Sequence, residues 1–393
     1  MEAAFGPSPL PAPEPARPGV RILSVVGTRP QLIKAAALGP ALRARHEEIF
    51  VDTGQHWDDD LAGVFFAELG LPRPDVSLGI GGGTASEQVG RMLLALDAVL
   101  AERRPDVVLV YGDTNSTLAG ALAAAQRGLP LAHVEAGLRS FDRSMPEEIN
   151  RVVTDHLARW CFAPTETAVA NLAREGIREG VLLVGDVLQD LAARTIPEIR
   201  DPAVLAEIGR RLLGGGAALA PGGYLFATVH RAANRSPEAM RRWLGLLAAV
   251  GQPERPVVLP LHPGTRAAIE AAGFVIPDLV VVVPPVGYRT SLALQLHAAA
   301  VLTDSGGVQR EAAWLGVPCL VLRETTEWRE AVEGSRGRLV VVGLDARRAV
   351  AELERLAPPD RVPLEATERA ARLDLRPAGA AEAIARALAG GEA

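Results

Sequence analysis

The sequence has almost no lysine. Of its 41 lysine and arginine residues only Lys34 is a lysine, so arginine supplies nearly every positive charge. One explanation is a codon bias against lysine that has left a single lysine by chance. The other is a site that needs a compact ammonium group rather than the planar guanidinium fork. The residues around Lys34, described below, favour the second explanation.

Aromatic residues, cysteines and long apolar runs are also scarce. Aromatics make up 4% of the 393 residues and the formal net charge is −6, so neither stacking platforms nor a basic surplus points to nucleic acid. Cys161 and Cys319 lie far apart without metal-ligand spacing, which argues against a disulfide framework or a zinc site and suggests a reducing, cytoplasmic compartment. No uncharged apolar run of about 18 residues occurs, so no membrane association is expected.

The sequence does contain apolar runs that alternate with segments whose apolar residues have the spacing of a helix. The runs span residues 20–27, 48–54, 106–113, 130–137, 159–165, 180–186, 224–230, 255–263, 279–286, 298–307, 317–323 and 337–343. Solidly apolar strands separated by helices are typical of a parallel sheet covered on both faces. The alternation breaks near 186–205 and then restarts, which predicts two such units in tandem.

We therefore predict an α/β protein with two Rossmann-like, doubly wound domains that face each other across a cleft. The first 20 residues, rich in proline and alanine, are expected to form a disordered tail. The domains are assigned to residues 21–190 and 191–375. Residues 376–393 are expected to form a helix that can pack back on the first domain.

Polar residues follow the apolar runs repeatedly, where a parallel sheet binds its ligands beyond the carboxyl ends of the strands. They are Arg29, Gln55, His56, Asp113, Glu135, His230, His262 and the segment "TDSGG" at 303–307. His133 and His297 are instead interpreted as core histidines, and His262 as shaping the floor of the cleft.

The segment "GTRPQLIK" at 27–34 places Arg29 and Lys34 at the turn into a helix, whose first N–H groups favour an anion. A phosphate cradle and a tight turn with a surface arginine are equally good interpretations of this segment alone.

A second turn, "LTDSGGVQREAAWLG", contains Ser305, Gly306 and Gly307 just before a helix. Two glycines allow a ligand to approach the backbone closely. Glu311 comes four residues after Gly307, where a carboxylate can accept two hydroxyls of a ribose or complement the helix dipole. A nucleotide diphosphate site is the favoured interpretation.

Acidic residues are expected to converge at the strand ends of the first domain. Asp113 and Glu135 follow apolar runs, Glu147 comes shortly after, and Arg151 can keep one of them ionised. Helix capping is the alternative for Asp113. With His230 as a further proton carrier, the set predicts acid–base chemistry on a nucleotide-linked substrate.

Taken together, the motifs resemble the non-hydrolysing UDP-N-acetylglucosamine 2-epimerases. They are "GTRPQLIK", "TGQH", "GDTNSTLAGALAAAQRGLPLAHVEAGLRS", "PEEINR", "FAPTE", "TVHR" and "LTDSGGVQREAAWLGVPCLVLRETTE", in order over residues 21 to 345. The resemblance implies the glycosyltransferase-B arrangement of two Rossmann domains, with UDP held by the second.

The resemblance also implies a reaction. UDP is eliminated as the C2 proton leaves, a 2-acetamidoglucal forms, and re-addition gives the manno epimer without a cofactor or metal. The groups that match the family's catalytic and supporting residues are Asp113, Glu135, Glu147, His230 and Arg151. Those that match or complete its UDP-binding set are Arg29, Lys34, His262, Ser305, Gly306, Gly307, Glu311 and Arg323. Gln55 and His56 match a stretch that contacts an activating second UDP-GlcNAc in some members, and members are commonly homodimers.

Two departures bear on the substrate. Trp328 follows "TTE" where the family often has arginine, and Ala233 removes a carboxylate from the usual "HRAEN". At both positions the sequence is more similar to the branch of the family that acts on UDP-2,3-diacetamido-2,3-dideoxy-glucuronic acid or other modified sugars. A glycosyltransferase of the same architecture, a hydrolysing epimerase and a nucleotide-sugar sensor stay as alternatives. The sensor is disfavoured because three carboxylates would repel the diphosphate to no purpose.

Overall fold

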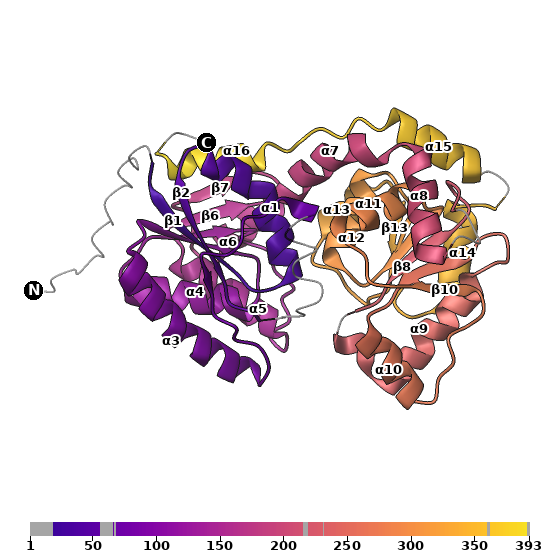
Figure 1. The fold of residues 1–393 in the computed structure, drawn as a ribbon, viewed down its shortest axis with the longest axis horizontal. Coiled ribbons are helices and arrows are strands. Elements are labelled where there is room, and N and C mark those ends of the chain that lie inside the picture. Colours follow the sequence, from indigo (N-terminus) through magenta and orange to yellow (C-terminus); the bar gives the residue numbers. More distant parts are fainter. Residues whose placement is uncertain are drawn as a thin grey trace, which may run out of the picture.

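Two parallel β-sheets, each flanked by helices, lie side by side in a computed structural model of the chain (Figure 1). The structure describes residues 19–55, 66, 68–214, 219–230, 232–359 and 362–390. The expected tail lies outside the described residues as far as residue 18.

The first sheet has seven strands in the order β3-β2-β1-β4-β5-β6-β7, all paired in parallel. Its strands are β1 (Arg21–Val26), β2 (Glu47–Asp52), β3 (Val76–Ser77), β4 (Val107–Tyr111), β5 (Leu131–Val134), β6 (Trp160–Ala163) and β7 (Val181–Leu183). Its helices are α1 (Arg29–Arg43), α3 (Ala85–Arg103), α4 (Asn115–Gln126), α5 (Pro146–Leu157) and α6 (Glu166–Arg174).

The central strands are apolar on both faces because both faces are covered. In β1, Ile22 and Val26 join the apolar cluster that includes α1, while Leu23 and Val25 join the one that includes α3 and α4. Successive side chains of a strand point to opposite faces, so a strand between two helical layers needs apolar residues at every position. This accounts for the unbroken apolar runs in the sequence.

The second sheet has six parallel strands in the order β10-β9-β8-β11-β12-β13. They are β8 (Leu225–Thr228), β9 (Val257–Pro260), β10 (Val280–Val283), β11 (Ala300–Thr303), β12 (Cys319–Val321) and β13 (Leu339–Val341). The helical segments are η1 (Ala232–Arg235), α9 (Pro237–Val250), α10 (Pro263–Ala271), α11 (Tyr288–His297), α12 (Gly306–Trp314), α13 (Arg329–Gly334), α14 (Ala346–Leu356) and α15 (Val362–Arg372).

Two consecutive helices, α7 (Val187–Ile199) and α8 (Pro202–Leu213), join the sheets where the alternation breaks. Helix α7 packs against α1 on one side and against α11 and α12 on the other. The last helix, α16 (Ala380–Leu388), returns to the first half and packs on α1 and α7, close to the labelled C-terminus (Figure 1). The exact division into domains stays a prediction.

The predicted α/β class with two doubly wound sheets is confirmed, and each of the predicted apolar runs contains a strand. The pattern did not include β3, which has only two residues. Among the described residues, no helix is long and apolar enough to cross a membrane.

Candidate active site

The order of each sheet reverses at one point, and the predicted site residues stand at both reversals. In the first sheet the reversal lies between β1 and β4, which are followed by Arg29 and Asp113. In the second it lies between β8 and β11, which are followed by His230 and Ser305. Such switch points are where open α/β sheets bind ligands.

Glu135 stands at the centre of the charged cluster. It follows β5, its side chain is nearly buried, and it pairs with Lys34 from α1. Its other oxygen, Oε1, lies 3.0 Å from Nη1 of Arg310, which comes from α12 of the second half. The same guanidinium pairs with Asp186 at the start of α7. Cations from both halves therefore enclose one carboxylate.

Asp113 belongs to the same cluster through Arg151, with which it pairs. Nη1 of Arg151 also lies 3.1 Å from Oε2 of Glu148. Glu148 is buried, and its carboxylate accepts hydrogen bonds from the backbone and hydroxyl of Ser140 and from the backbone N–H of Phe141. Hydrogen bonds to the charged form hold the pKa of Glu148 below its usual range although burial opposes this. Glu147 is exposed in the first turn of α5.

Backbone conformation places Glu135 where it stands. Glu135, in the turn after β5, has φ of 72°, and Gly112, in the turn after the neighbouring strand β4, has φ of 63°, both in the left-handed region. A Cβ atom on Gly112 would lie 2.8 Å from Nζ of Lys34. The turn therefore needs glycine for its conformation and for the space that Lys34 occupies.

His133 supports this turn from the core. It is fully buried, its Nδ1 lies 2.6 Å from Oδ1 of Asp155, and its Nε2 lies 2.7 Å from the carbonyl oxygen of Gly112. Arg139 neutralises Asp155 from the other side at 2.7 Å. The interpretation of His133 as a core histidine is confirmed, and so is that of His297, whose Nε2 contacts the Ile199 carbonyl at 3.0 Å.

Lys34 titrates closer to neutrality than an ordinary lysine. Burial lowers its pKa to about 8, although the neighbouring Asp113 carboxylate acts in the opposite direction. A cation with such a pKa can release its proton within the working range of an enzyme. Together with the enclosed carboxylates, Lys34 makes this cluster the part of the described chain best suited to proton transfer.

The glycine-rich turn of the second half begins α12, as expected. Ser305 caps the helix by accepting the N–H of Val308, and the first helical N–H groups have no partner within the helix. A Cβ atom on Gly307 would meet nothing nearer than the Ser305 hydroxyl at 3.8 Å, so the backbone is open to a ligand there. Gly306 differs, because a Cβ there would lie 2.9 Å from both Glu327 and Trp328.

Glu311 lies one turn further along α12. It is buried, and its Oε2 accepts a hydrogen bond from Nε2 of Gln295 at 2.6 Å. Burial raises its pKa, with the Gln295 hydrogen bond opposing. The proposed contact of Glu311 with a ribose stays a prediction.

The remaining predicted binding residues line the strand ends in different ways. The side chain of His230 is 60% exposed, with Nδ1 3.5 Å from Oδ1 of the buried Asp304. His262 caps α10 by accepting the N–H of Gly264. Arg29 begins α1, and Arg323 pairs with Glu327 at 2.7 Å.

Gln55 has a structural role in this arrangement. Its Oε1 accepts hydrogen bonds from the backbone N–H and the hydroxyl of Ser116 at the start of α4. His56 lies outside the described residues. The predicted contact of both with an activating nucleotide stays a prediction.

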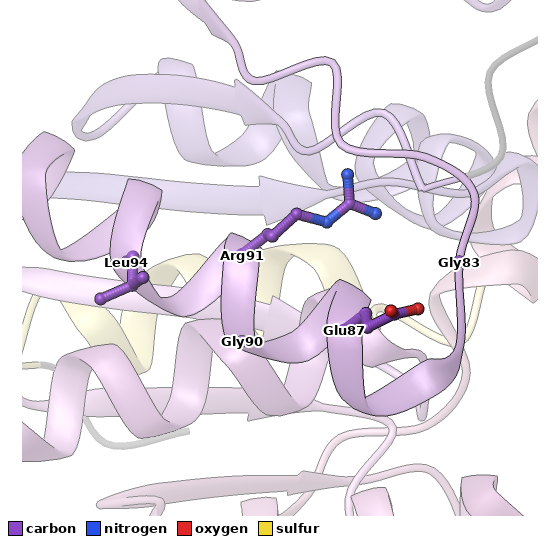
Figure 2. Close-up of a pocket in the computed structure, with 5 residues that line it drawn as sticks. All are labelled: Gly83, Glu87, Gly90, Arg91 and Leu94. Atoms are coloured by element: carbon purple, nitrogen blue, oxygen red, sulfur yellow. The ribbon is translucent and has the colours of Figure 1, made fainter.

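A surface pocket lies next to the turn that precedes α3 (Figure 2). Its charged lining residues already serve local structure, because Glu87 completes the capping box of α3 and Arg91 donates to the carbonyls of Gly81 and Gly82. Gly83, Gly90 and Leu94 complete the lining. Its charged side chains are exposed, whereas those of Lys34 and Glu135 in the cluster are nearly buried.

The sequence analysis did not assign four residues to the cluster: Arg310, Asp186, Glu148 and Trp328. Asp186 stands directly after an apolar run, so the rule that found Asp113 would have found it as well. Trp328 was noted only as a departure from the family pattern. Its ring centroid lies 3.7 Å from Cζ of Arg310.

Comparison with known proteins finds relatives that match most of the chain in sequence and in fold. A Pseudomonas aeruginosa protein, UDP-2,3-diacetamido-2,3-dideoxy-D-glucuronate 2-epimerase, is 43% identical over 342 residues, which are 86% of this chain and 92% of that protein. The crystal structure of Methanocaldococcus jannaschii UDP-GlcNAc 2-epimerase in complex with UDP-GlcNAc and UDP matches with a TM-score of 0.79 and 34% identity, covering 94% of this chain and 100% of that one. A Streptomyces glycosyltransferase, 16% identical with a TM-score of 0.50, shares the fold alone.

The likeness to these structures confirms the glycosyltransferase-B type of fold. The family model described as UDP-N-acetylglucosamine 2-epimerase matches residues 41–389. The resemblance inferred from the motifs is thereby confirmed, and the chain belongs to the UDP-N-acetylglucosamine 2-epimerase family, as an isomerase of the non-hydrolysing type.

Proposed function

We propose that this isomerase inverts C2 of a UDP-linked 2-acetamido sugar by eliminating UDP and adding it back. The observation that carries the proposal is the cluster in which Asp113 and Glu135, at neighbouring strand ends, are enclosed by Lys34, Arg151 and Arg310. A carboxylate base at a switch point can remove the C2 proton, and a protonated acidic group on the other face of the sugar can return one.

The elimination step must couple two events. A C2 proton is barely acidic, so a carboxylate of the cluster removes it as the C1–O bond breaks and its electrons pass to the departing diphosphate. A double bond forms between C1 and C2, giving a 2-acetamidoglucal. A protonated acid of the cluster then delivers a proton to the other face of C2 while a diphosphate oxygen attacks C1, which gives the epimer. Proton exchange with solvent restores the starting protonation states of the base and the acid.

Departure of UDP requires stabilisation of the growing negative charge. The open backbone at Gly307 and the first N–H groups of α12 supply fixed dipoles, while Arg29 and His230 supply cationic or hydrogen-bonding side chains from the two switch points. Glu311, in the same helix, is our candidate for the ribose hydroxyls. Enclosure between the two halves would keep water from the glycal.

For the substrate, the P. aeruginosa relative and the two departures at Trp328 and Ala233 favour a modified sugar such as a 2,3-diacetamido-uronic acid. The M. jannaschii structure favours UDP-GlcNAc itself. We propose a UDP-2-acetamido sugar as the class and treat its C3 and C6 substituents as the question for experiment.

The test is a panel of UDP-sugars incubated with the protein in heavy water and followed by proton NMR. We expect deuterium at C2 and a manno epimer that remains linked to UDP. Transfer to an acceptor without C2 exchange would identify a glycosyltransferase instead. Accumulation of free sugar and UDP would identify a hydrolysing enzyme, and tight binding without any turnover a sensor.

We also propose a homodimer. Helices α3 and α5 of the first half, which both pack on α4, expose large apolar side chains. These are Leu94 on α3 and Ile149 and Leu157 on α5, which are 76%, 49% and 36% exposed. Exposed apolar surface of this kind marks interaction sites more often than random surface does. Sedimentation velocity at micromolar concentration should give a dimer, and Ile149→Glu should shift it toward monomer.

A further inference from the structure

Arg310 connects the two halves of the molecule at the catalytic cluster. It lies in the first turns of α12, is 5% exposed, and its Nη1 contacts both Glu135 (3.0 Å from Oε1) and Asp186. Glu135 begins the turn after β5, and Asp186 caps α7, the helix that leads out of the first half. One cation of the second half thus holds two carboxylates of the first.

Trp328 fixes the guanidinium from the opposite side. Its ring lies 3.7 Å from Cζ of Arg310 in a stacked cation–π contact. Trp328 is itself buried against residues of the first half, Leu138, Ala163 and Ala168. Arg310 and Trp328 both belong to the second half, so the two carboxylates of the first half reach them only when the halves are in contact.

A purely structural role explains this arrangement poorly. A buried ion pair contributes little net stability, because the cost of removing charges from water is close to the attraction gained. A direct role in binding the substrate also fits poorly, because Arg310 is enclosed by Glu135, Asp186 and Trp328. What the structure does show is direct contact between the Arg310 guanidinium and the Glu135 carboxylate.

The charges that face Glu135 make its ionisation sensitive to this contact. Lys34 contributes a positive charge from α1, and Asp113 with its partner Arg151 lies on the side of β4 and α5. Removing Arg310 would leave Asp186 close to Glu135 with Lys34 as the remaining cation in contact. Two carboxylates that share too little positive charge favour protonation of one of them.

We propose that Arg310 is a positioning residue that orients Glu135 and keeps it ionised when the two halves are closed, and that Trp328 is the platform that holds the guanidinium in place. This inference rests on the proposed proton-transfer role of Glu135. It gives Trp328 a reason to stand where the family often has arginine, because an aromatic ring suits the face of a guanidinium and a second cation would repel it.

The test compares Arg310→Met and Arg310→Lys with the natural protein, using the UDP-sugar that exchanges its C2 proton. We expect Arg310→Met to lower kcat by about 10- to 100-fold, to move the acid limb of the pH profile to higher pH, and to change the Kd for UDP by less than about two-fold. Arg310→Lys should recover only part of kcat, because lysine keeps the charge but lacks the planar fork. Arg210→Met, at an exposed arginine paired with Glu207, is the matched control and should have no effect on any of these measurements.

Two further variants test the inference if Arg310→Met does not fold and show whether Arg310 acts through Glu135. Should Arg310→Met fail to fold, Trp328→Phe keeps an aromatic surface of smaller area and should lower kcat with the same shift of the acid limb. In the double variant Glu135→Gln/Arg310→Met, kcat should equal that of Glu135→Gln alone, because Arg310 acts through Glu135. An unchanged kcat and pH profile in folded Arg310→Met would overturn the inference, as would additive effects in the double variant. If Glu135→Gln alone were fully active, the proposed role of Glu135 would fail first, independently of Arg310.

Discussion

Glu135 has two cationic partners, Lys34 from α1 and Arg310 from α12, and Asp113 has Arg151. A buried carboxylate is costly unless it is paired. Each of these cations lowers that cost. At the scale of single residues, the site is therefore built by charge compensation, and its variants should affect turnover before they affect binding of UDP.

Isosteric amides test the carboxylates directly. Asp113→Asn and Glu135→Gln keep the size of each side chain but remove the charge, so turnover should fall by roughly 10²-fold or more if these groups transfer protons. Proton NMR gives kcat and calorimetry gives the Kd for UDP, which should stay within a few-fold. Asp97→Asn, at an exposed aspartate paired with Arg127, is the control. Near-normal rates in both site variants would remove them from the chemistry.

Lys34 predicts a pH dependence. Burial lowers its pKa from 10.5 to about 8, so the ammonium loses its proton as the pH rises through about 8, and Glu135 then loses one of its two cations. We expect kcat/KM to fall on the alkaline side of this value. The free energy of unfolding should instead rise between about pH 8 and 10.5, because the unfolded chain there keeps the proton that the folded chain has released.

Lys34→Arg separates charge from shape. The guanidinium stays protonated, so the alkaline limb near pH 8 should disappear from the profile. The maximal rate should nevertheless be lower, because Nζ is packed close to Gly112 and the larger fork has no room there. If the alkaline limb persisted unchanged in Lys34→Arg, another group would be responsible for it.

At the scale of elements, the turns after β4 and β5 carry the site. Gly112 and Glu135 have left-handed backbones, and the His133 imidazole contacts the Gly112 carbonyl from the core. Strained conformations of this kind persist only where surrounding contacts determine them. The strand therefore ends in a turn whose geometry depends on packing behind it as well as on its own residues.

Gly112→Ala and Gly128→Ala form a matched pair for this turn. Both glycines have positive φ, 63° and 67°, so each substitution should cost about 1–2 kcal/mol of unfolding free energy. A Cβ at 128 meets nothing within 4 Å, whereas one at 112 reaches Lys34. Thermal melts should show both losses, but only Gly112→Ala should lower kcat. Equal activity of the two variants would show that Lys34 can move aside without consequence.

At the scale of the whole molecule, α7 and α16 hold the halves together. Asp190 of α7 accepts the N–H groups of Gly379 and Ala381 at 2.8 Å each, and Nε2 of His46 lies 2.8 Å from the carbonyl oxygen of Ala385 in α16. The final helix thus fastens the end of the chain to both α1 and α7. Because α7 also contacts α11 and α12, this fastening supports the orientation of the second sheet.

Loss of the hydrogen bonds between Asp190 and the start of α16 should lower the free energy of unfolding. Asp190→Ala leaves two backbone N–H groups without their acceptor, so the free energy of unfolding should fall by about 1–3 kcal/mol. Chemical denaturation measures the loss, and Asp97→Ala at an exposed salt bridge is the control, with a much smaller expected change. An equal effect of the two substitutions would mean that α16 contributes little to the closed arrangement.

The sequence by itself determined the two doubly wound sheets, the turns that carry Asp113, Glu135 and Ser305, and the family. These features follow from local signals, since apolar runs define buried strands and parallel strands end at one edge of their sheet. Only the tertiary structure decided which charges meet. Lys34 and Glu135 are 101 residues apart, and Arg310 and Asp186 are 124 apart. The Lys34–Glu135 pair depends on how α1 packs on the first sheet, and the Arg310–Asp186 pair depends on how the two halves meet. No local period of the sequence encodes either contact.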